Sequence, residues 1–384
     1  MDAFSYRCPT RIIFGVGQIV ALSIEVPAAA RILMVHGGGS IMRNGVYDQV
    51  QSALSRHQVV EFDGIRPNPE YEDCREALEV LKESSCDFIL AVGGGSVLDA
   101  AKFIAAAACY DGEEPWDLIE DRNLVTEALP VGAVLTLPAT GSEMNGNTVI
   151  SRAAITQKRA LCHPALYPVF SILDPATTTT LSPRQSANGI IDAFVHVCEQ
   201  YVTYPAEAPL QDRQAEAILL TLIEEGPKVM ADPENLTARA NVMWAATNAL
   251  NGLIGVGVPG DWASHQIGHE LTALYGIDHA QSLAVAMPGV WEVCREAKQA
   301  KLAQYAWRVW GLHGLGSEVA ARQAVARTED FFRSLGVGTT LAEYDIPVEA
   351  ADLVAQHLSQ RGVVLGEHQS ITPEVVAEIL RLRA

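Results

Sequence analysis

The sequence has too few basic residues to bind polyanions. It contains 27 Lys and Arg residues against 46 Asp and Glu residues, which gives a formal net charge of −19 at pH 7. A surface of this sign repels the phosphates of nucleic acids and the head groups of anionic lipids. We therefore expect neither nucleic acid nor a membrane surface as a partner.

Long apolar runs and paired cysteines are also missing. No apolar run reaches the roughly 18 residues of a membrane-spanning helix, and the stretch MDAFSYRCPTRIIFG lacks the basic and then apolar layout of a secretory signal peptide. The seven cysteines are scattered and never spaced as Cys-x-x-Cys, which indicates neither a disulfide framework nor a cysteine zinc site. We expect a cytoplasmic protein with reduced thiols.

Short apolar runs alternate with amphipathic stretches in the first half of the chain, as in parallel α/β sheets. Most of these runs are continuously apolar, which is expected for strands that are covered on both faces. The predicted strands are Ile32–Val35, Val59–Phe62, Phe88–Val92, Val131–Leu137 and Val169–Leu173.

The second half of the chain has only helical spacing, for example in residues 215–225, 237–253, 298–309 and 317–335. Ser182 and Pro183 form an N-cap and first-turn pair, so we expect a helix to begin there. We predict a doubly wound α/β domain over residues 1–180 and an all-α domain over residues 181–384.

Two predicted strands run into the same Gly-Gly-Gly-Ser sequence, at Gly37–Ser40 and Gly93–Ser96. Glycine lets backbone N–H groups approach a ligand closely, and a helix that begins there directs its dipole at phosphate. One such turn is as often an ordinary tight turn, but a third polar, glycine-bearing turn, Thr136–Glu143, follows another strand. Because the carboxyl ends of parallel strands share one edge, we expect the three turns to bind one dinucleotide.

The first turn also indicates which dinucleotide binds. Sites for NAD usually place a carboxylate on the ribose 2′-hydroxyl, and this carboxylate would repel a 2′-phosphate. No acidic residue lies between Arg31 and Tyr47, whereas Ser40 and Arg43 supply a hydroxyl and a positive charge. NADP(H) is therefore favoured over NAD(H).

Acidic and histidine side chains of the second half have the spacing of metal ligands. Asp192 and His196 lie four residues apart, so that on a helix their Cβ atoms are about 5–6 Å apart and both can reach one ion. His265, His269 and His279 follow within fifteen residues. Any one of these histidines alone is more often a hydrogen-bonded core or surface residue, but the set favours a metal site.

The three later histidines cannot all lie on one straight helix if they share an ion. His265 and His279 would then be about 21 Å apart. Gly276 is placed to end the first helix, so we expect the chain to fold back there and return His279 to the site.

The spacing of His265 and His269 also occurs in zinc peptidases. Their mechanism needs a Glu directly after the first His as the general base, and this chain has Gln266 there. Since an amide cannot take the proton, the sequence disfavours a peptidase.

The sequence resembles the iron-containing (group III) alcohol dehydrogenase family, most closely its butanol-dehydrogenase-like branch of NADPH-dependent aldehyde reductases. The likeness covers essentially the full chain, through YRCPTRIIFG, GGGSVLDAAKFIAAA, LTLPATGSE, DAFVHVCEQYVT, DWASHQIGHELTALYGIDHAQ and LGEHQSIT. It implies a Rossmann-like N-terminal domain, a helical C-terminal domain, an active site in the cleft between them, and a homodimer.

The resemblance also implies a role for individual residues. The metal ligands would be Asp192, His196, His265 and His279, while His269 would contact the substrate or relay a proton. The implied cofactor contacts are Gly38, Gly39 and Ser40 at the adenosine 2′-phosphate, Gly94, Gly95, Ser96 and Asp99 near the pyrophosphate, and Thr136, Thr140, Asn145 and Lys158 along the rest of the molecule. Little motif surrounds Lys158, which could equally be a solvated surface lysine, and ATGSE stands where many members have GTGSE.

The expected reaction is reversible hydride transfer between NADPH and a small aldehyde, with one divalent metal ion polarising the carbonyl oxygen. Three imidazoles and one carboxylate suit zinc or ferrous iron, provided that the ion accepts a further ligand. Alternatives are a polyol dehydrogenase, a dehydroquinate-synthase-like lyase that uses NAD and a metal, and a nucleotide-binding regulator without turnover. The neutral residues around the metal motifs suit small or apolar aldehydes better than the acidic, phosphorylated substrate of such a lyase.

Overall fold

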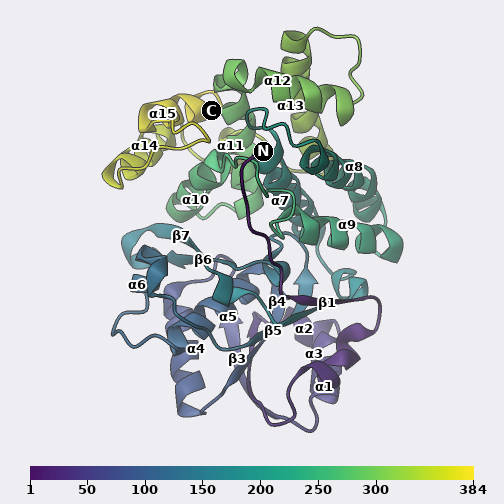
Figure 1. Cartoon of the computed structure of the whole chain (residues 1–384), viewed down its shortest axis with the longest axis vertical. Helices are drawn as coiled ribbons and strands as arrows, with labels where there is room; N and C mark the ends of the chain where they lie inside the picture. The colour runs from purple at the N-terminus through teal and green to yellow at the C-terminus, as the bar shows by residue number, and fades with distance from the viewer. The chain divides into compact units, whose positions relative to one another are not determined.

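The computed structural model describes residues 1–384 and divides the chain into two compact units (Figure 1). The unit that we call the sheet unit consists of Arg7–Ser182 and Pro233–Thr247. The other, the helical unit, consists of Met1–Tyr6, Pro183–Asp232 and Asn248–Ala384. The chain therefore passes from one unit to the other four times.

The sheet unit is built on six parallel strands in the order β1-β8-β5-β4-β2-β3. The five predicted strands are confirmed, whereas β1 at the sheet edge and the antiparallel hairpin β6-β7 were not predicted. The strands are β1 (Arg11–Phe14), β2 (Arg31–Gly37), β3 (Gln58–Ile65), β4 (Phe88–Gly94), β5 (Val131–Leu137), β6 (Asn147–Arg152), β7 (Gln157–Cys162) and β8 (Phe170–Leu173).

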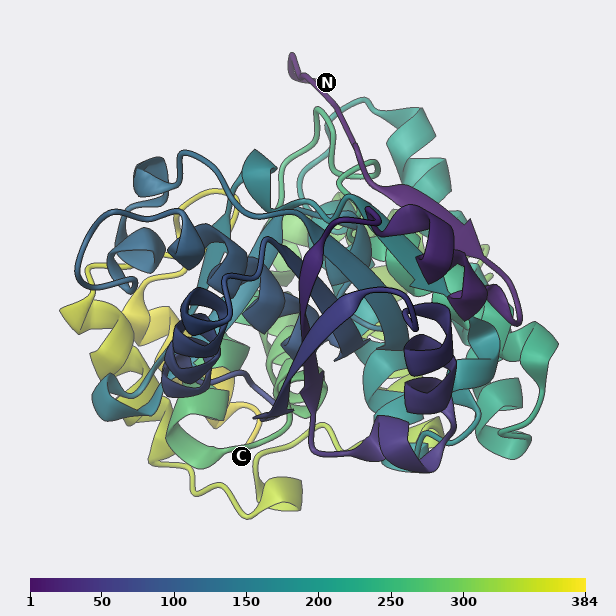
Figure 2. The same cartoon turned by 90° about the horizontal axis from the view of Figure 1, so that it is seen from below.

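Helices cover both faces of this sheet, which explains why the central strands are continuously apolar. On β2, Leu33 and Val35 belong to the core beneath α4 and α5, while Ile32 and Met34 belong to the core beneath α1 and α3. Figure 2 shows these helix pairs on opposite sides of the strands. The helices are α1 (Leu22–Glu25), α2 (Ser40–Arg43), α3 (Val46–Ala53), α4 (Tyr71–Glu83), α5 (Gly95–Ala108) and α6 (Asp117–Glu120).

The remaining helices confirm the predicted all-α second half. The first of them begins at Pro183, as the Ser182–Pro183 pair predicts, and it is buried along nearly all of its length beyond Gln185. None of the helices is both long and apolar enough to cross a lipid bilayer. They are α7 (Pro183–Tyr201), α8 (Pro209–Ala231), α9 (Leu236–Ala249), α10 (Ala263–Tyr275), α11 (His279–Val293), α12 (Arg295–Arg308), α13 (Ser317–Ser334), α14 (Ala350–Gln360) and α15 (Pro373–Arg381).

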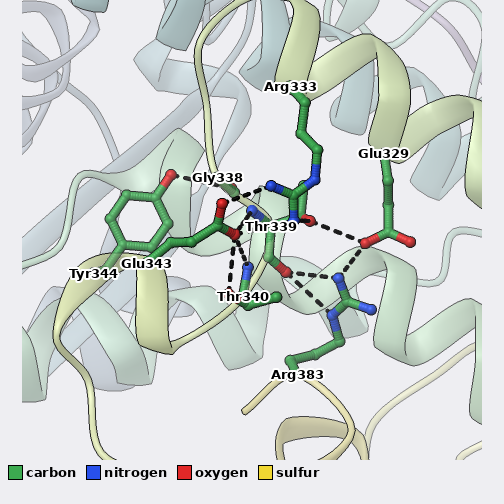
Figure 3. Close-up of polar contacts among 8 residues, drawn as sticks. All are labelled: Glu329, Arg333, Gly338, Thr339, Thr340, Glu343, Tyr344 and Arg383. Atoms are coloured by element: carbon green, nitrogen blue, oxygen red, sulfur yellow. Dashed lines mark hydrogen bonds and ion pairs between the residues drawn. The ribbon is translucent and has the colours of Figure 1, made fainter.

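A polar cluster fixes the loop after α13 and the end of the chain (Figure 3). The Glu343 carboxylate accepts hydrogen bonds from the backbone N–H groups of Thr339, at 2.9 Å, and Thr340, at 3.0 Å. The Arg333 guanidinium donates to the same carboxylate at 2.6 Å. Arg383, which follows α15, donates to the carbonyl oxygen of Thr339 at 2.7 Å. The loop thus ties the last helix to α13.

We expect Glu343→Gln to destabilise the protein at neutral pH more than at acidic pH. The Arg333 guanidinium lowers the pKa of Glu343 from 4.5 to about 2. A carboxyl group whose pKa is lower in the folded state stabilises the fold above its unfolded pKa, and this contribution is lost as the pH falls from about 4.5 towards 2. Because Glu343 is partly exposed, we expect a loss of only about 1 kcal/mol at pH 7.

The measurement is the midpoint of urea unfolding of both proteins at pH 7 and pH 3. Glu318→Gln is the control, since Glu318 forms only an exposed ion pair with Arg322 on the same helix. An equal effect of Glu343→Gln at both pH values would contradict the assignment.

Candidate functional site

The three glycine-bearing turns end neighbouring strands of the sheet unit. β5, β4 and β2 are adjacent and parallel, so the turns that follow them lie at one edge. The order of the strands reverses between β2 and β4, because β3 lies beyond β2 and β5 lies beyond β4. Such a switch point opens the crevice in which α/β sheets bind ligands.

The first turn is open. Gly39 has a φ of 84°, in the left-handed region that favours glycine, and precedes α2. A Cβ atom on Gly38 would meet nothing within 4 Å, and Ser40 is exposed. The Arg43 guanidinium, on the same short helix, lies 3.9 Å from the position of a Cβ on Gly39. The predicted contacts of the adenosine 2′-phosphate are thus together and accessible.

The second turn needs glycine for packing as well. A Cβ on Gly95 would lie 2.6 Å from a methyl carbon of Thr140, and one on Gly94 would lie 3.0 Å from Leu137. The turn before α5 can therefore pack directly on the turn after β5 only because these two residues have no side chains. Ser96 begins this helix with Gly95, and its hydroxyl accepts a hydrogen bond from the N–H of Asn68 at 3.3 Å.

Two buried charged residues of α5, the unpredicted Lys102 and the predicted Asp99, hold the loop after β5. The Lys102 ammonium donates to the Ser142 hydroxyl at 2.8 Å and to the carbonyl oxygens of Asn145 and Asn147 at 2.9 and 2.8 Å. Burial lowers the pKa of Lys102 to about 8. Asp99, on the same helix, accepts from the same Ser142 hydroxyl at 2.5 Å, and burial raises the pKa of this carboxyl. The one visible signal was an Asp and a Lys three residues apart in an otherwise apolar helix.

The observed role of Asp99 is to position this loop, and its contact with the pyrophosphate region stays a prediction. Asn145 and Thr140 shape the same loop, since their side-chain oxygens accept from the N–H groups of Asn147, at 2.9 Å, and Ser142, at 3.2 Å. Thr136 is buried at the end of β5. Their contacts with the cofactor also stay predictions.

Lys158 is not a solvated surface lysine. It lies on β7 with 6% of its surface exposed, and its ammonium donates to the side-chain oxygen of Asn68 at 2.7 Å. Because Asn68 also contacts Ser96, this lysine is linked to the second glycine turn. Its contact with the cofactor remains a prediction.

In the helical unit, three of the four predicted metal ligands come together. Asp192 on α7, His265 on α10 and His279 at the start of α11 each offer one ligand atom, and these atoms lie within 4.8 Å of one another. The predicted turn at Gly276 is confirmed: this residue has a φ of 68° and ends α10. The turn returns His279 to within 3.7 Å of Asp192.

The other two histidines of the prediction lie beside this cluster. His196 Nδ1 is 3.6 Å from Asp192 Oδ1, and its ring centroid is 4.5 Å from that of His265, but His196 is outside the converging set. Burial lowers the pKa of His196 to about 4, so at neutral pH it has the uncharged form that binds metals. The His269 ring lies 5.2 Å from that of His279. The ligand role of His196 and the proton role of His269 stay predictions.

Glu199, which was not predicted, adds a second buried carboxylate beside this cluster. It lies one helical turn after His196, and its Oε2 is 2.6 Å from His265 Nδ1. Burial raises the pKa of Glu199. A carboxylate and the imidazoles of His265 and His279, the first of them oriented by a second carboxylate, are donors of the kind that zinc and ferrous iron bind. The cluster therefore fits a divalent transition metal.

Comparisons with known proteins match both parts of the chain to one family. The family model described as "Iron-containing alcohol dehydrogenase" matches residues 9–175, and the model of the C-terminal part of the same family matches residues 186–383. The chain is 50% identical over 382 residues to the NADPH-dependent aldehyde reductase YqhD of Escherichia coli, with 99% of each chain covered. It is 40% identical over 386 residues to the probable NADH-dependent butanol dehydrogenase 1 of Bacillus subtilis, again with 99% of each covered.

The fold is likewise similar to solved structures. The crystal structure of YqhD from E. coli K-12 superposes with a TM-score of 0.98 and 49% sequence identity, covering 100% of this chain and 99% of that one. The two-part architecture is thus common to the two proteins.

Proposed function

Because the chain belongs to the iron-containing alcohol dehydrogenase family, we propose that it reduces small aldehydes to primary alcohols with NADPH, reversibly and with one divalent metal ion, zinc or ferrous iron. The observation that carries this proposal is the convergence of Asp192, His265 and His279 in a mostly buried cluster. The relative that is 50% identical is named as an NADPH-dependent aldehyde reductase, which favours aldehydes and NADPH over the polyol and lyase alternatives.

In this proposal the chain's own residues bind the metal ion and relay a proton. Asp192, His196, His265 and His279 hold the ion. When bound, the ion supplies a Lewis acid for the carbonyl oxygen and the nicotinamide supplies the hydride. His269, 5% exposed and one helical turn beyond His265, relays the proton that the product hydroxyl gains.

The sheet unit holds the cofactor. The N–H groups at Gly94, Gly95 and Ser96 and the dipole of α5 face the pyrophosphate. Gly38, Gly39 and Ser40 hold the 2′-phosphate, with the positive charge of Arg43 nearby. The reaction requires the nicotinamide to reach the metal of the helical unit. The remaining contacts are Asp99, Thr136, Thr140, Asn145 and Lys158.

The proposal includes a cytoplasmic homodimer that forms through β1. This strand lies at the edge of the sheet, where backbone groups are available to another strand. The residues that follow it expose apolar side chains: Val16 is 58%, Val20 66% and Ile24 83% exposed. Two copies related by a twofold axis would pair their β1 strands and cover both apolar patches with the same surface.

Removal of the metal tests the reaction. We expect NADPH oxidation with short aldehydes to stop after chelation and to return when zinc or ferrous iron is added. His279→Ala removes one of the converging ligands, so turnover should be lost while NADPH affinity, measured by fluorescence, is retained. Unchanged turnover in this variant would refute the metal assignment. No oxidation of NADPH or NADH by metal-loaded protein would favour the lyase or the regulator.

A negative charge in the first turn tests the preference for NADPH. We expect Ser40→Asp to weaken NADPH binding at least about fivefold and NADH binding much less, because a carboxylate within several ångströms of the 2′-phosphate costs on the order of 1–3 kcal/mol. The measurement is the KM for each cofactor. Ser52→Asp, an exposed change near the far end of α3, adds the same charge and should alter neither value. Equal losses for both cofactors would rule out the assigned contact.

The double substitution Val20→Asp, Ile24→Asp tests the dimer. Charges at these two positions would be buried in the proposed contact, so light scattering should give twice the mass of one chain for the native protein and the mass of one chain for the variant. Val319→Asp, at a 49% exposed position on α13, is the control. A dimer that persists in the double variant would place the contact elsewhere.

A further inference from the structure

The side chain of Glu199 contacts His265, one of the proposed metal ligands. Its Oε2 lies 2.6 Å from Nδ1 of His265, and both residues are buried. At this distance Nδ1 carries the proton and donates it to the carboxylate, because a deprotonated nitrogen would face a second acceptor. The other ring nitrogen, Nε2, then has the lone pair that a metal needs.

We propose that Glu199 is a positioning residue that sets the tautomer and the orientation of His265 and so determines how tightly the protein binds its metal. This inference rests on the proposed function, because it assumes that His265 is a ligand. Partners of this kind behind a metal-bound histidine commonly change metal affinity by 10–100-fold when they are replaced.

The same carboxylate fixes the backbone from which His265 projects. Its two oxygens accept hydrogen bonds from the backbone N–H groups of Ser264, at 2.9 Å, and His265, at 3.2 Å. These groups lie in the first turn of α10, and the residue before this helix, Trp262, provides no side-chain cap. Glu199, which lies on α7, therefore provides the side-chain cap that α10 lacks. One side chain thus controls both the start of the helix and the direction of the ring.

A buried ion-pair network holds the segment that leads into α10. The backbone N–H of Asp261 donates to the carbonyl oxygen of Glu199 at 2.9 Å, which joins this segment to α7. The Asp261 carboxylate pairs with the Lys298 ammonium at 2.9 Å, and Lys298 also pairs with Glu367 at 2.6 Å. Buried ion pairs are seldom better for stability than apolar packing, so this cluster is better explained by the precise placement of the segment.

Glu199→Gln separates the positioning role from a purely structural one. Glutamine keeps the size of the side chain and one acceptor oxygen. If that oxygen takes the place of Oε1 and accepts from the N–H of Ser264, the NH2 group takes the place of Oε2, faces Nδ1 of His265 and donates to it. The proton of the ring then moves to Nε2, which blocks the nitrogen that should bind the metal.

The experiment measures zinc binding to chelator-stripped protein by competition with a chromophoric chelator. We expect Glu199→Gln to weaken zinc binding 10–100-fold, and NADPH affinity to remain unchanged. In addition, ¹⁵N spectra of the histidine-labelled apoprotein should show the proton of His265 on Nδ1 in the native protein and on Nε2 in the variant. A merely structural carboxylate would not move either readout.

The matched control is Glu216→Gln. Glu216 is also a buried carboxylate of the helical unit, and it accepts from Tyr201 at 2.8 Å and pairs with Arg308, away from the histidines. This variant should lose stability but keep its zinc affinity. If Glu199→Gln does not fold, Glu199→Asp keeps the charge but withdraws the carboxylate from the ring, and weaker zinc binding is again expected.

Three outcomes are distinguishable. Weaker zinc binding together with the changed tautomer supports the inference. Native zinc affinity in a folded Glu199 variant overturns the inference and leaves the proposed function intact. Failure of the native protein to bind zinc or ferrous iron overturns the proposed function as well.

Discussion

The helical unit depends on one constraint, which is that α7 is buried along most of its length and yet carries ionisable side chains. Asp192, His196 and Glu199 lie on one stretch of this helix, and none is more than 4% exposed. Burial of a carboxylate costs several kcal/mol unless hydrogen bonds or opposite charges compensate it. The surrounding elements therefore supply the compensation: the start of α10 meets Glu199, and His279 at the start of α11 returns to Asp192.

The sheet unit solves a similar problem on α5. This helix is apolar apart from Ser96, Asp99 and Lys102, and the last of these is fully buried. The ammonium donates its hydrogen bonds to the loop after β5 instead of to water. The loop therefore has a fixed shape before any ligand binds. In both units the buried charges lie next to residues that we propose to bind the metal or the cofactor. Preorganisation of this kind reduces the ordering that binding would otherwise require.

Much of the fold could be predicted because its signals are local. Continuous apolar runs revealed β2, β4 and β5, the glycine turns marked their carboxyl ends, and Gly276 marked the end of α10. β1 was missed because four residues at a sheet edge give little periodicity, and the hairpin β6-β7 because polar and apolar residues are mixed in it.

The site could be predicted only as far as local spacing reaches. His265 and Glu199 are 66 residues apart, and Lys102 and Asn145 are 43 apart, so no helical period connects them. Only the packing of one element on another shows that these side chains meet. Which residues contact the metal and the cofactor depends on where these two ligands bind. The spacing of residues in the sequence does not give that position.

The four passages of the chain between its units limit how this protein can be divided or rearranged. Residues 233–247 lie far along the chain but belong to the sheet unit, where Met243 is fully buried in the core and Thr247 donates to the buried Glu143 carboxylate at 2.6 Å. A fragment that ended at residue 182 would leave a hole in that core and strip Glu143 of its hydrogen-bond donor. Neither unit is one continuous stretch of the chain. A single cut in the gene could therefore not have added, removed or exchanged one unit in evolution.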